Sequence, residues 1–197
     1  FMRKLFDPVN NPTGLNKLGI ASYANTGRLD IGLRLAQDST AIKNKINALS
    51  PSGATNIGGG IVKADNEFKD NGTFDCKTIR TMIVMTDGVA NEPGSNSNAR
   101  TFAENSASNA YITTNSETSN IDSSDNSEYN TTIHAIGLFG AIDGSTESIA
   151  RNTMQTIAAN GHGTFQETES AANLNTLYQN VFSQLAWSAK QISANIA

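Results

Sequence analysis

Residues 78–93 read Thr78-Ile-Arg-Thr-Met-Ile-Val-Met-Thr-Asp-Gly-Val-Ala-Asn-Glu-Pro93. Their apolar run, Met82–Met85, is short, includes β-branched residues and is bounded by polar residues. This pattern is typical of a strand covered on both faces, as in a parallel α/β sheet. The run ends at Thr86-Asp87-Gly88, which places a carboxylate at the carboxyl end of a central strand, the edge where open α/β sheets bind ligands. An Asp-Gly pair is also a common turn. Whether Asp87 binds a ligand or only forms a turn is therefore judged from the sequence upstream.

Upstream, a glycine-dense loop from Pro51 to Gly60 leads directly into a helix. The helix is indicated by apolar residues that share one face, namely Ile57, Ile61, Ala64 and Phe68. The loop itself contains Gly53-Ala-Thr55-Asn56. If Thr55 and Asp87 come to the same edge of a sheet, their hydroxyl and carboxylate are hard oxygen ligands. Such ligands suit Mg²⁺, Ca²⁺ or Mn²⁺ and do not suit zinc or copper.

Strands and helices alternate along the rest of the chain. Residues 1–6 are typical of the end of a helix, and residues 7–14, with two prolines and a glycine, indicate a loop. Strands are expected at 17–24, 28–33, 82–85, 132–139 and 164–168, and helices around 42–49, 57–68, 98–111, 146–158 and 174–192. The first two strands flank a tight turn and form a hairpin at the edge of the sheet. The pattern predicts one α/β domain, doubly wound, with a mostly parallel open sheet and one antiparallel edge hairpin.

Bulk composition excludes some classes of partner. The 197 residues are 38% hydrophobic and 16% charged, with a net charge of −4. A nucleic-acid surface would need clustered basic residues, and a membrane span needs ~20 consecutive apolar residues. We therefore expect no nucleic-acid partner and no membrane span in this chain. Low charge with abundant Asn, Ser and Thr suggests an extracellular or cell-surface protein. The single cysteine, Cys76, cannot form an internal disulfide.

Residues 94–130 form a stretch of different composition. They contain eight Asn, nine Ser and four Thr among 37 residues. A helix is expected from about Asn98 to Tyr111, and the remainder, from Thr113 to Asn130, reads as a long loop. We interpret the stretch as a polar insertion in a domain that spans residues 1–197. It is either a solvated insertion without a role or a binding loop near the site.

In this order and spacing, the motifs resemble the von Willebrand factor type A (VWA) family. The resemblance runs from Lys17 to about Phe182 and includes Leu-Gly-Ile-Ala-Ser-Tyr, Gly-Ala-Thr-Asn-Ile-Gly and Met-Ile-Val-Met-Thr-Asp-Gly. In that family a metal-ion-dependent adhesion site combines an Asp-x-Ser-x-Ser loop, a distant Thr and a later Asp in a Thr-Asp-Gly turn. The resemblance implies that Thr55 binds the metal directly or through water. It also implies that Asp87 lies in the inner or second shell of a site for Mg²⁺, or for Ca²⁺ or Mn²⁺.

The sequence departs from the family at its start. No Asp-x-Ser-x-Ser occurs upstream of Lys17, and Asp7-Pro-Val-Asn-Asn has no serine hydroxyl. In the family that motif ends the first strand, which lies in the centre of the sheet. A central gap would leave buried backbone groups unpaired, at about 1–3 kcal/mol each, against a net stability of about 5–15 kcal/mol. We therefore expect that residues 1–197 begin inside the domain and that upstream sequence or another chain supplies the strand.

Three functions follow from these observations. The first is an extracellular or cell-surface adhesion module that binds an acidic group of a protein ligand through a divalent metal. The second is a structural module of a pilus or other surface assembly, with an absent or vestigial metal site. The third, an enzyme, is disfavoured because the glycine-dense loop lacks both a P-loop ending and a dinucleotide fingerprint. The two histidines, His134 and His162, lie apart, without a serine or cysteine nucleophile that would pair with either.

Overall fold

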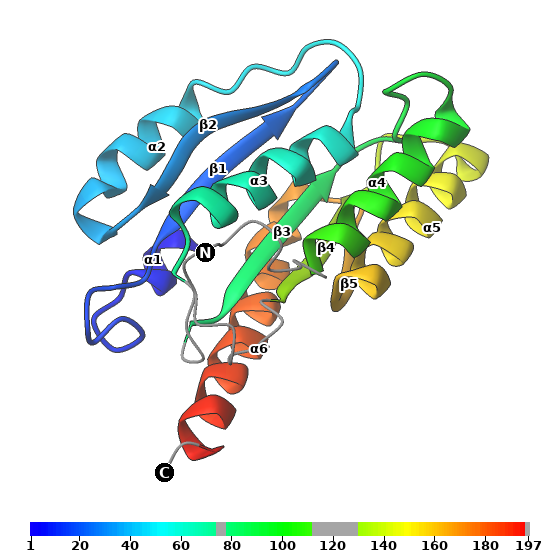
Figure 1. Cartoon of the computed structure of the whole chain (residues 1–197). Helices are drawn as coiled ribbons and strands as arrows, with labels where there is room; N and C mark the ends of the chain where they lie inside the picture. The colour runs from blue at the N-terminus through cyan, green and yellow to red at the C-terminus, as the bar shows by residue number, and fades with distance from the viewer. Residues whose placement is uncertain (74–77, 112–129, 196–197) are drawn as a thin grey trace, which may run out of the picture.

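The computed structural model describes the backbone of residues 1–73, 78–111 and 130–195, and the side chains of these ranges as far as residue 185. Cys76 and residues 113–129 of the polar stretch therefore lie outside the described residues. Strands and helices alternate along the chain as expected (Figure 1).

The strands form two sheets. β1 (Leu18–Tyr23) and β2 (Gly27–Arg34) form the expected antiparallel hairpin. β3 (Arg80–Thr86), β4 (Thr131–Leu138) and β5 (His162–Thr168) form a parallel sheet in the order β3-β4-β5. The run Met82–Met85 is thus the middle of a parallel strand, and Asp87 follows directly after it. Within the described ranges, no ladder of hydrogen bonds joins β1 to β3.

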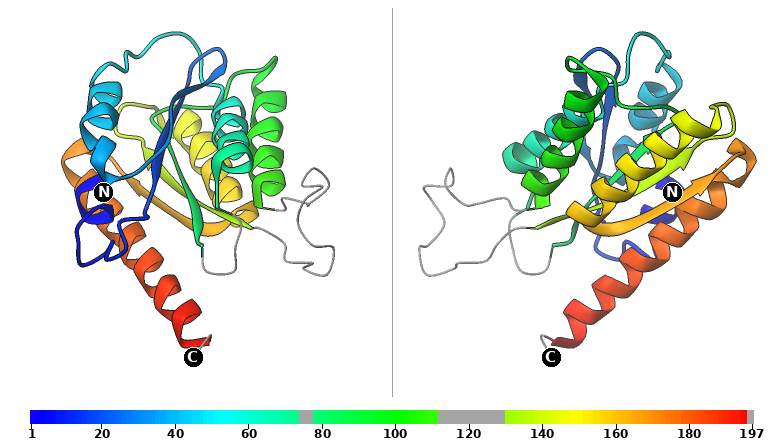
Figure 2. Two further views of the ribbon diagram at one scale, coloured as in Figure 1. Left: turned by 60° about the vertical axis from the view of Figure 1, so that its left-hand side comes forward. Right: turned by 90° about the vertical axis from the view of Figure 1, so that its right-hand side faces the viewer.

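Helices cover both faces of the strands. They are α1 (Met2–Leu5), α2 (Ser39–Asn47), α3 (Ile57–Asn71), α4 (Asn96–Tyr111), α5 (Gly144–Asn160) and α6 (Leu174–Asn195). The helices α3, α4 and α5 lie on one face, and α6 lies on the other with α1 beside it (Figures 1 and 2). The last turns of α6 project beyond the sheets (Figure 2). Among the described helices, none combines the length and hydropathy that a membrane crossing requires.

The core lies between the parallel sheet and the helices α3, α4 and α5. Met82 and Val84 of β3 and Ile133 and Ala135 of β4 are buried there. The side of α4 that faces this core consists of fully buried alanines: Ala99, Ala103, Ala107 and Ala110. Because these side chains are small, α4 can pack closely although its sequence is rich in polar residues. The first part of the polar stretch is therefore a core helix.

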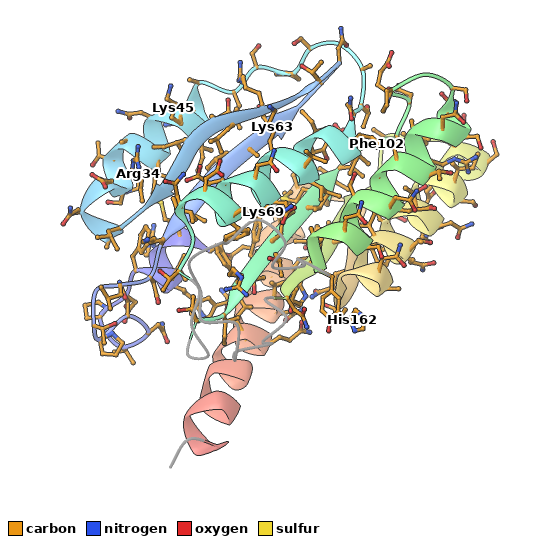
Figure 3. All side chains as sticks on the ribbon, in the orientation of Figure 1. Arg34, Lys45, Lys63, Lys69, Phe102 and His162 are labelled. Carbon is orange, nitrogen blue, oxygen red and sulfur yellow. The ribbon has the colours of Figure 1, made fainter. Side chains whose placement is uncertain are left out.

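Gly58, Gly59 and Gly60, the last residues of the glycine-dense stretch, lie inside α3. The helix begins at Ile57, because Asn56 caps it and accepts a hydrogen bond from Gly59 N at 2.7 Å. A β-carbon on Gly58 would lie 2.4 Å from Cδ1 of Phe102, which lies beside this helix turn (Figure 3). A β-carbon on Gly60 would lie 2.5 Å from the ring of Tyr23. Close packing thus explains glycine here, at a cost in helix propensity of about 1 kcal/mol per residue.

Candidate functional site

Thr55 lies at the carboxyl edge of the strands, in the loop between α2 and α3. Its N–H donates to Oδ1 of Asn91 at 2.6 Å, and its carbonyl accepts from Asn91 N at 3.1 Å. Asn91 belongs to the loop after β3. A β-carbon on Gly88 would lie 3.9 Å from the Thr55 hydroxyl oxygen. The hydroxyl therefore faces the turn that contains Asp87.

Asp87 is exposed and follows the last residue of β3. The turn is fixed by Thr86, whose hydroxyl accepts from Gly88 N at 3.2 Å and donates to Gly88 O at 3.1 Å. The pKa of Tyr23 is raised to about 12, chiefly by burial; a hydrogen bond with Thr86 acts to lower this pKa, and the negative charge of Asp87 acts to raise it. The carboxylate thus lies within electrostatic reach of a phenol that ends β1. The structure brings the loops of both sequence-predicted residues, Thr55 and Asp87, to one edge.

Two asparagines that sequence reasoning missed hold this edge together. Asn25, in the β1–β2 turn, accepts from Ala54 N at 2.8 Å, and its carbonyl accepts from the amide of Asn56 at 3.0 Å. Asn91 holds the other side of the Thr55 loop. The sequence showed Asn25 only as a turn residue and Asn91 only as part of a loop. Their partners are backbone groups distant in sequence, so no local pattern could have identified them.

The donor set fits part of a site for a hard cation. Thr55 and Asp87 offer one hydroxyl and one carboxylate, the ligand types that Mg²⁺ and Ca²⁺ take, but these ions need about six or more oxygens. Within the described residues, no three His, Cys, Asp or Glu side chains are grouped as a metal site. The remaining ligands of a cation here would have to be water, an acidic group of a ligand, or residues outside the described ranges.

The two histidines lie away from this edge. His134 is buried in β4, where its Nδ1 accepts from Thr164 N at 3.1 Å, and burial lowers its pKa. His162 is exposed at the start of β5, stacked on Tyr111 with ring centroids 3.8 Å apart (labelled in Figure 3). Neither belongs to the Thr55–Asp87 edge.

Comparisons with known proteins agree on the fold. The model of the von Willebrand factor type A domain family matches residues 1–185. Several solved structures are similar. BatB from Bacteroides thetaiotaomicron is 17% identical, with a TM-score of 0.58, covering 94% of this chain and 86% of that chain. The vWF domain of the type V pili tip protein Mfa5 from Porphyromonas gingivalis is 16% identical, with a TM-score of 0.55, and the match covers 100% of this chain and 86% of that chain. A point mutant of the PilB minor pilin from Streptococcus sanguinis is 10% identical, with a TM-score of 0.67, and the match covers 98% of this chain and 55% of that chain.

A search of the curated proteins found no match. The family model covers nearly the whole chain, and the motif order, the parallel sheet and the helices on both faces agree with it. The chain therefore belongs to the von Willebrand factor type A domain family.

Proposed function

We propose that this chain is the binding module of an extracellular or cell-surface protein. It engages an acidic group of a protein ligand through a divalent cation, Mg²⁺ or else Ca²⁺ or Mn²⁺, held with Thr55 and Asp87. The observation that carries the proposal is the Thr55 hydroxyl, which faces the Asp87 turn and is held there from Asn91. An acidic group of the ligand completes the coordination, because the chain's own described residues leave most positions open.

A cell-surface location is supported by two observations. The names of two structural neighbours refer to a pilus tip protein and a minor pilin. The chain is also poor in charge, at 16% of residues. Both observations suit a module exposed outside the cell.

A structural module of a pilus or other surface assembly is the second candidate. The observation that favours it is the single carboxylate, Asp87, in the proposed cation site, together with the lack of a three-ligand metal group among the described residues. In this case the same fold would serve assembly, and divalent cations would have no effect on it.

An enzyme remains disfavoured by the role of the glycines. A phosphate would need free backbone N–H groups at the start of α3. There the N–H of Gly59 is bonded to the Asn56 side chain, and the space beside Gly58 is filled by Phe102. These residues are used for capping and packing.

Titration with Mn²⁺ followed by electron paramagnetic resonance tests the proposal, with EDTA reversal as a check. The unmodified chain is expected to bind one Mn²⁺, and Asp87→Asn is expected to abolish that binding. The matched control is Asp70→Asn, which removes the same charge from an exposed position at the opposite end of α3. Equal Mn²⁺ binding by Asp87→Asn and the unmodified chain would refute the site. No Mn²⁺ binding by the unmodified chain would favour the structural candidate.

A further inference from the structure

Positive and negative charge are separated along this chain. Residues 1–80 carry 11 Lys and Arg against 7 Asp and Glu, whereas residues 81–197 carry 3 Lys and Arg against 11 Asp and Glu. Four of these last acids lie outside the described residues. Protein surfaces ordinarily intersperse the two signs, because like charges gathered on one face repel each other. The two parts of the chain therefore differ in the charge of the surfaces that they form.

The positive charge gathers on β2, α2 and α3. Within the described residues, four exposed cations of these elements form no ion pair: Arg34, Lys43, Lys45 and Lys63. We call these four the basic face. Figure 3 shows Arg34, Lys45 and Lys63 on three neighbouring elements, on the side of the molecule that carries the hairpin. Aliphatic side chains that are at least 36% exposed lie on the same elements or just after α2: Leu29, Ile46, Leu49 and Val62. This side of the molecule thus offers both charge and apolar surface to a partner.

The acids of these three elements do not neutralise the basic face. The side chains of Asp30 and Asp65 are only 6% and 8% exposed, and each pairs with a cation of its own element that is not in the basic face. Glu67 is also buried, and it accepts a hydrogen bond from the backbone of β2 at 2.7 Å. Only Asp70, in the last turn of α3, is exposed. The carboxylates are thus mostly inside, while the cations of the basic face lie at the surface.

The negative charge gathers at the carboxyl edge of the parallel sheet. β3, β4 and β5 are parallel, so the loops that follow them lie at one edge. These loops, residues 87–95, 139–143 and 169–170, contain no Lys or Arg but four acids: Asp87, Glu92, Asp143 and Glu169. We call these four the acidic edge. Within the part of the chain that the structure describes, none of them forms an ion pair. The acidic edge and the basic face therefore carry opposite and uncompensated charge.

We infer that the basic face of one copy of this protein docks on the acidic edge of a second copy, in a head-to-tail contact. Charge complementarity selects a second copy as the partner, because surfaces of opposite sign attract each other before they touch. The contact joins two different surfaces, so a pair of copies still has one free basic face and one free acidic edge. Association therefore continues into a chain of copies or closes into a ring. The inference does not depend on a cation at Thr55 and Asp87.

The salt dependence of association tests the contact without any substitution. Sedimentation velocity of the unmodified chain is measured in EDTA over a range of protein concentrations. Two salt concentrations are compared, about 0.01 M and about 1 M NaCl, at which the Debye length is about 30 Å and about 3 Å. The average mass is expected to rise with protein concentration in low salt and to return to that of the monomer in high salt. A monomer at every concentration in low salt, or association that salt does not weaken, would overturn the inference.

Two charge-reversed variants identify the surfaces. Lys43→Glu/Lys45→Glu reverses charge on the basic face, and Glu92→Lys/Glu169→Lys reverses charge on the acidic edge. Each variant alone is expected to associate at least about tenfold more weakly, because like charges then meet. An equal mixture of the two is expected to associate again, because every surface then finds one of opposite sign. Unweakened association of either variant alone, or no recovery in a mixture of folded variants, would contradict the proposed pair of surfaces.

Arg3→Glu/Lys4→Glu is the matched control. It also reverses two exposed neighbouring cations, but on α1, away from the basic face. It is expected to associate as the unmodified chain does, and an equal loss here would mean that total charge, not the basic face, controls association. A chain that stays monomeric but binds polyglutamate through Lys43 and Lys45 would overturn the inference in favour of a different acidic partner.

Discussion

Thr55 and Asn91 are hydrogen-bonded in both directions, from Thr55 N to Asn91 Oδ1 at 2.6 Å and from Asn91 N to the Thr55 carbonyl at 3.1 Å. This pair couples the loop before α3 to the loop after β3. The direction of the Thr55 hydroxyl towards the Asp87 turn thus depends on a side chain that is not itself one of the proposed ligands. Support of this kind holds ligands in place at metal sites.

Asn91→Ala is expected to lower the free energy of unfolding by about 1 kcal/mol, because Thr55 N loses its acceptor. It should also weaken Mn²⁺ binding, since the Thr55 loop is no longer held from the β3 side. Urea denaturation and the Mn²⁺ titration measure the two effects. Asn66→Ala, at an exposed position on α3, is the control. It should change neither the free energy of unfolding nor Mn²⁺ binding by much. Unaltered stability in Asn91→Ala would mean that the loop is held without this bond.

A matched pair of variants at Thr55 distinguishes the contribution of its hydroxyl to Mn²⁺ binding from the contribution of its side-chain shape. Thr55→Ser keeps the hydroxyl and should retain Mn²⁺ affinity. Thr55→Val keeps the shape without the hydroxyl and should lower the affinity by about 10- to 100-fold, the range found when groups around a metal are removed. Equal affinity in both variants would exclude the hydroxyl from the site, whether it binds the metal directly or through water.

The sequence was sufficient to place Thr55 and Asp87 at one edge, because each adjoins a regular element with a clear period. Met82–Met85 read as a strand covered on both faces; it lies within β3, where Met82 and Val84 are buried and Ile83 and Met85 are half-buried. The same reasoning was ambiguous at Gly58, Gly59 and Gly60: it counted them in a glycine-dense loop, although the apolar face of the expected helix already began at Ile57. Glycine has low helix propensity. The propensity is overridden by tertiary contacts with Tyr23 and Phe102. Such contacts join residues distant in sequence and leave no local period.

Glycine at position 27 is required by a backbone contact, and this gives a stability test. A β-carbon there would lie 1.9 Å from the carbonyl oxygen of Gly59, and a backbone atom cannot move aside as a side chain can. Gly27→Ala is therefore expected to destabilise the fold by about 1–3 kcal/mol, the usual cost of overpacking. The control is Gly144→Ala at the start of α5, where a β-carbon meets nothing within 4 Å. There alanine should be neutral or stabilising by up to about 1 kcal/mol. Thermal unfolding of both variants measures the two changes in stability.

The buried imidazole of His134 makes stability depend on pH. Burial lowers the pKa of His134, because the charged form is poorly solvated between β4 and β5. In the unfolded chain this pKa is about 6.5. As the pH falls through that value, the unfolded chain takes up a proton before the folded protein does. The free energy of unfolding should therefore decrease from pH 7.5 towards pH 5 and be fully present above the unfolded pKa.

The variant His134→Asn isolates this contribution. Its amide oxygen can replace Nδ1 as the acceptor for Thr164 N, bonded at 3.1 Å in the unmodified protein, but it does not titrate. The variant should be less stable at pH 7.5, because a buried ring is lost, and its stability should depend less on pH between 7.5 and 5. Urea denaturation across this pH range compares the slopes. An unchanged slope in His134→Asn would mean that carboxylates alone set the acid sensitivity of the fold.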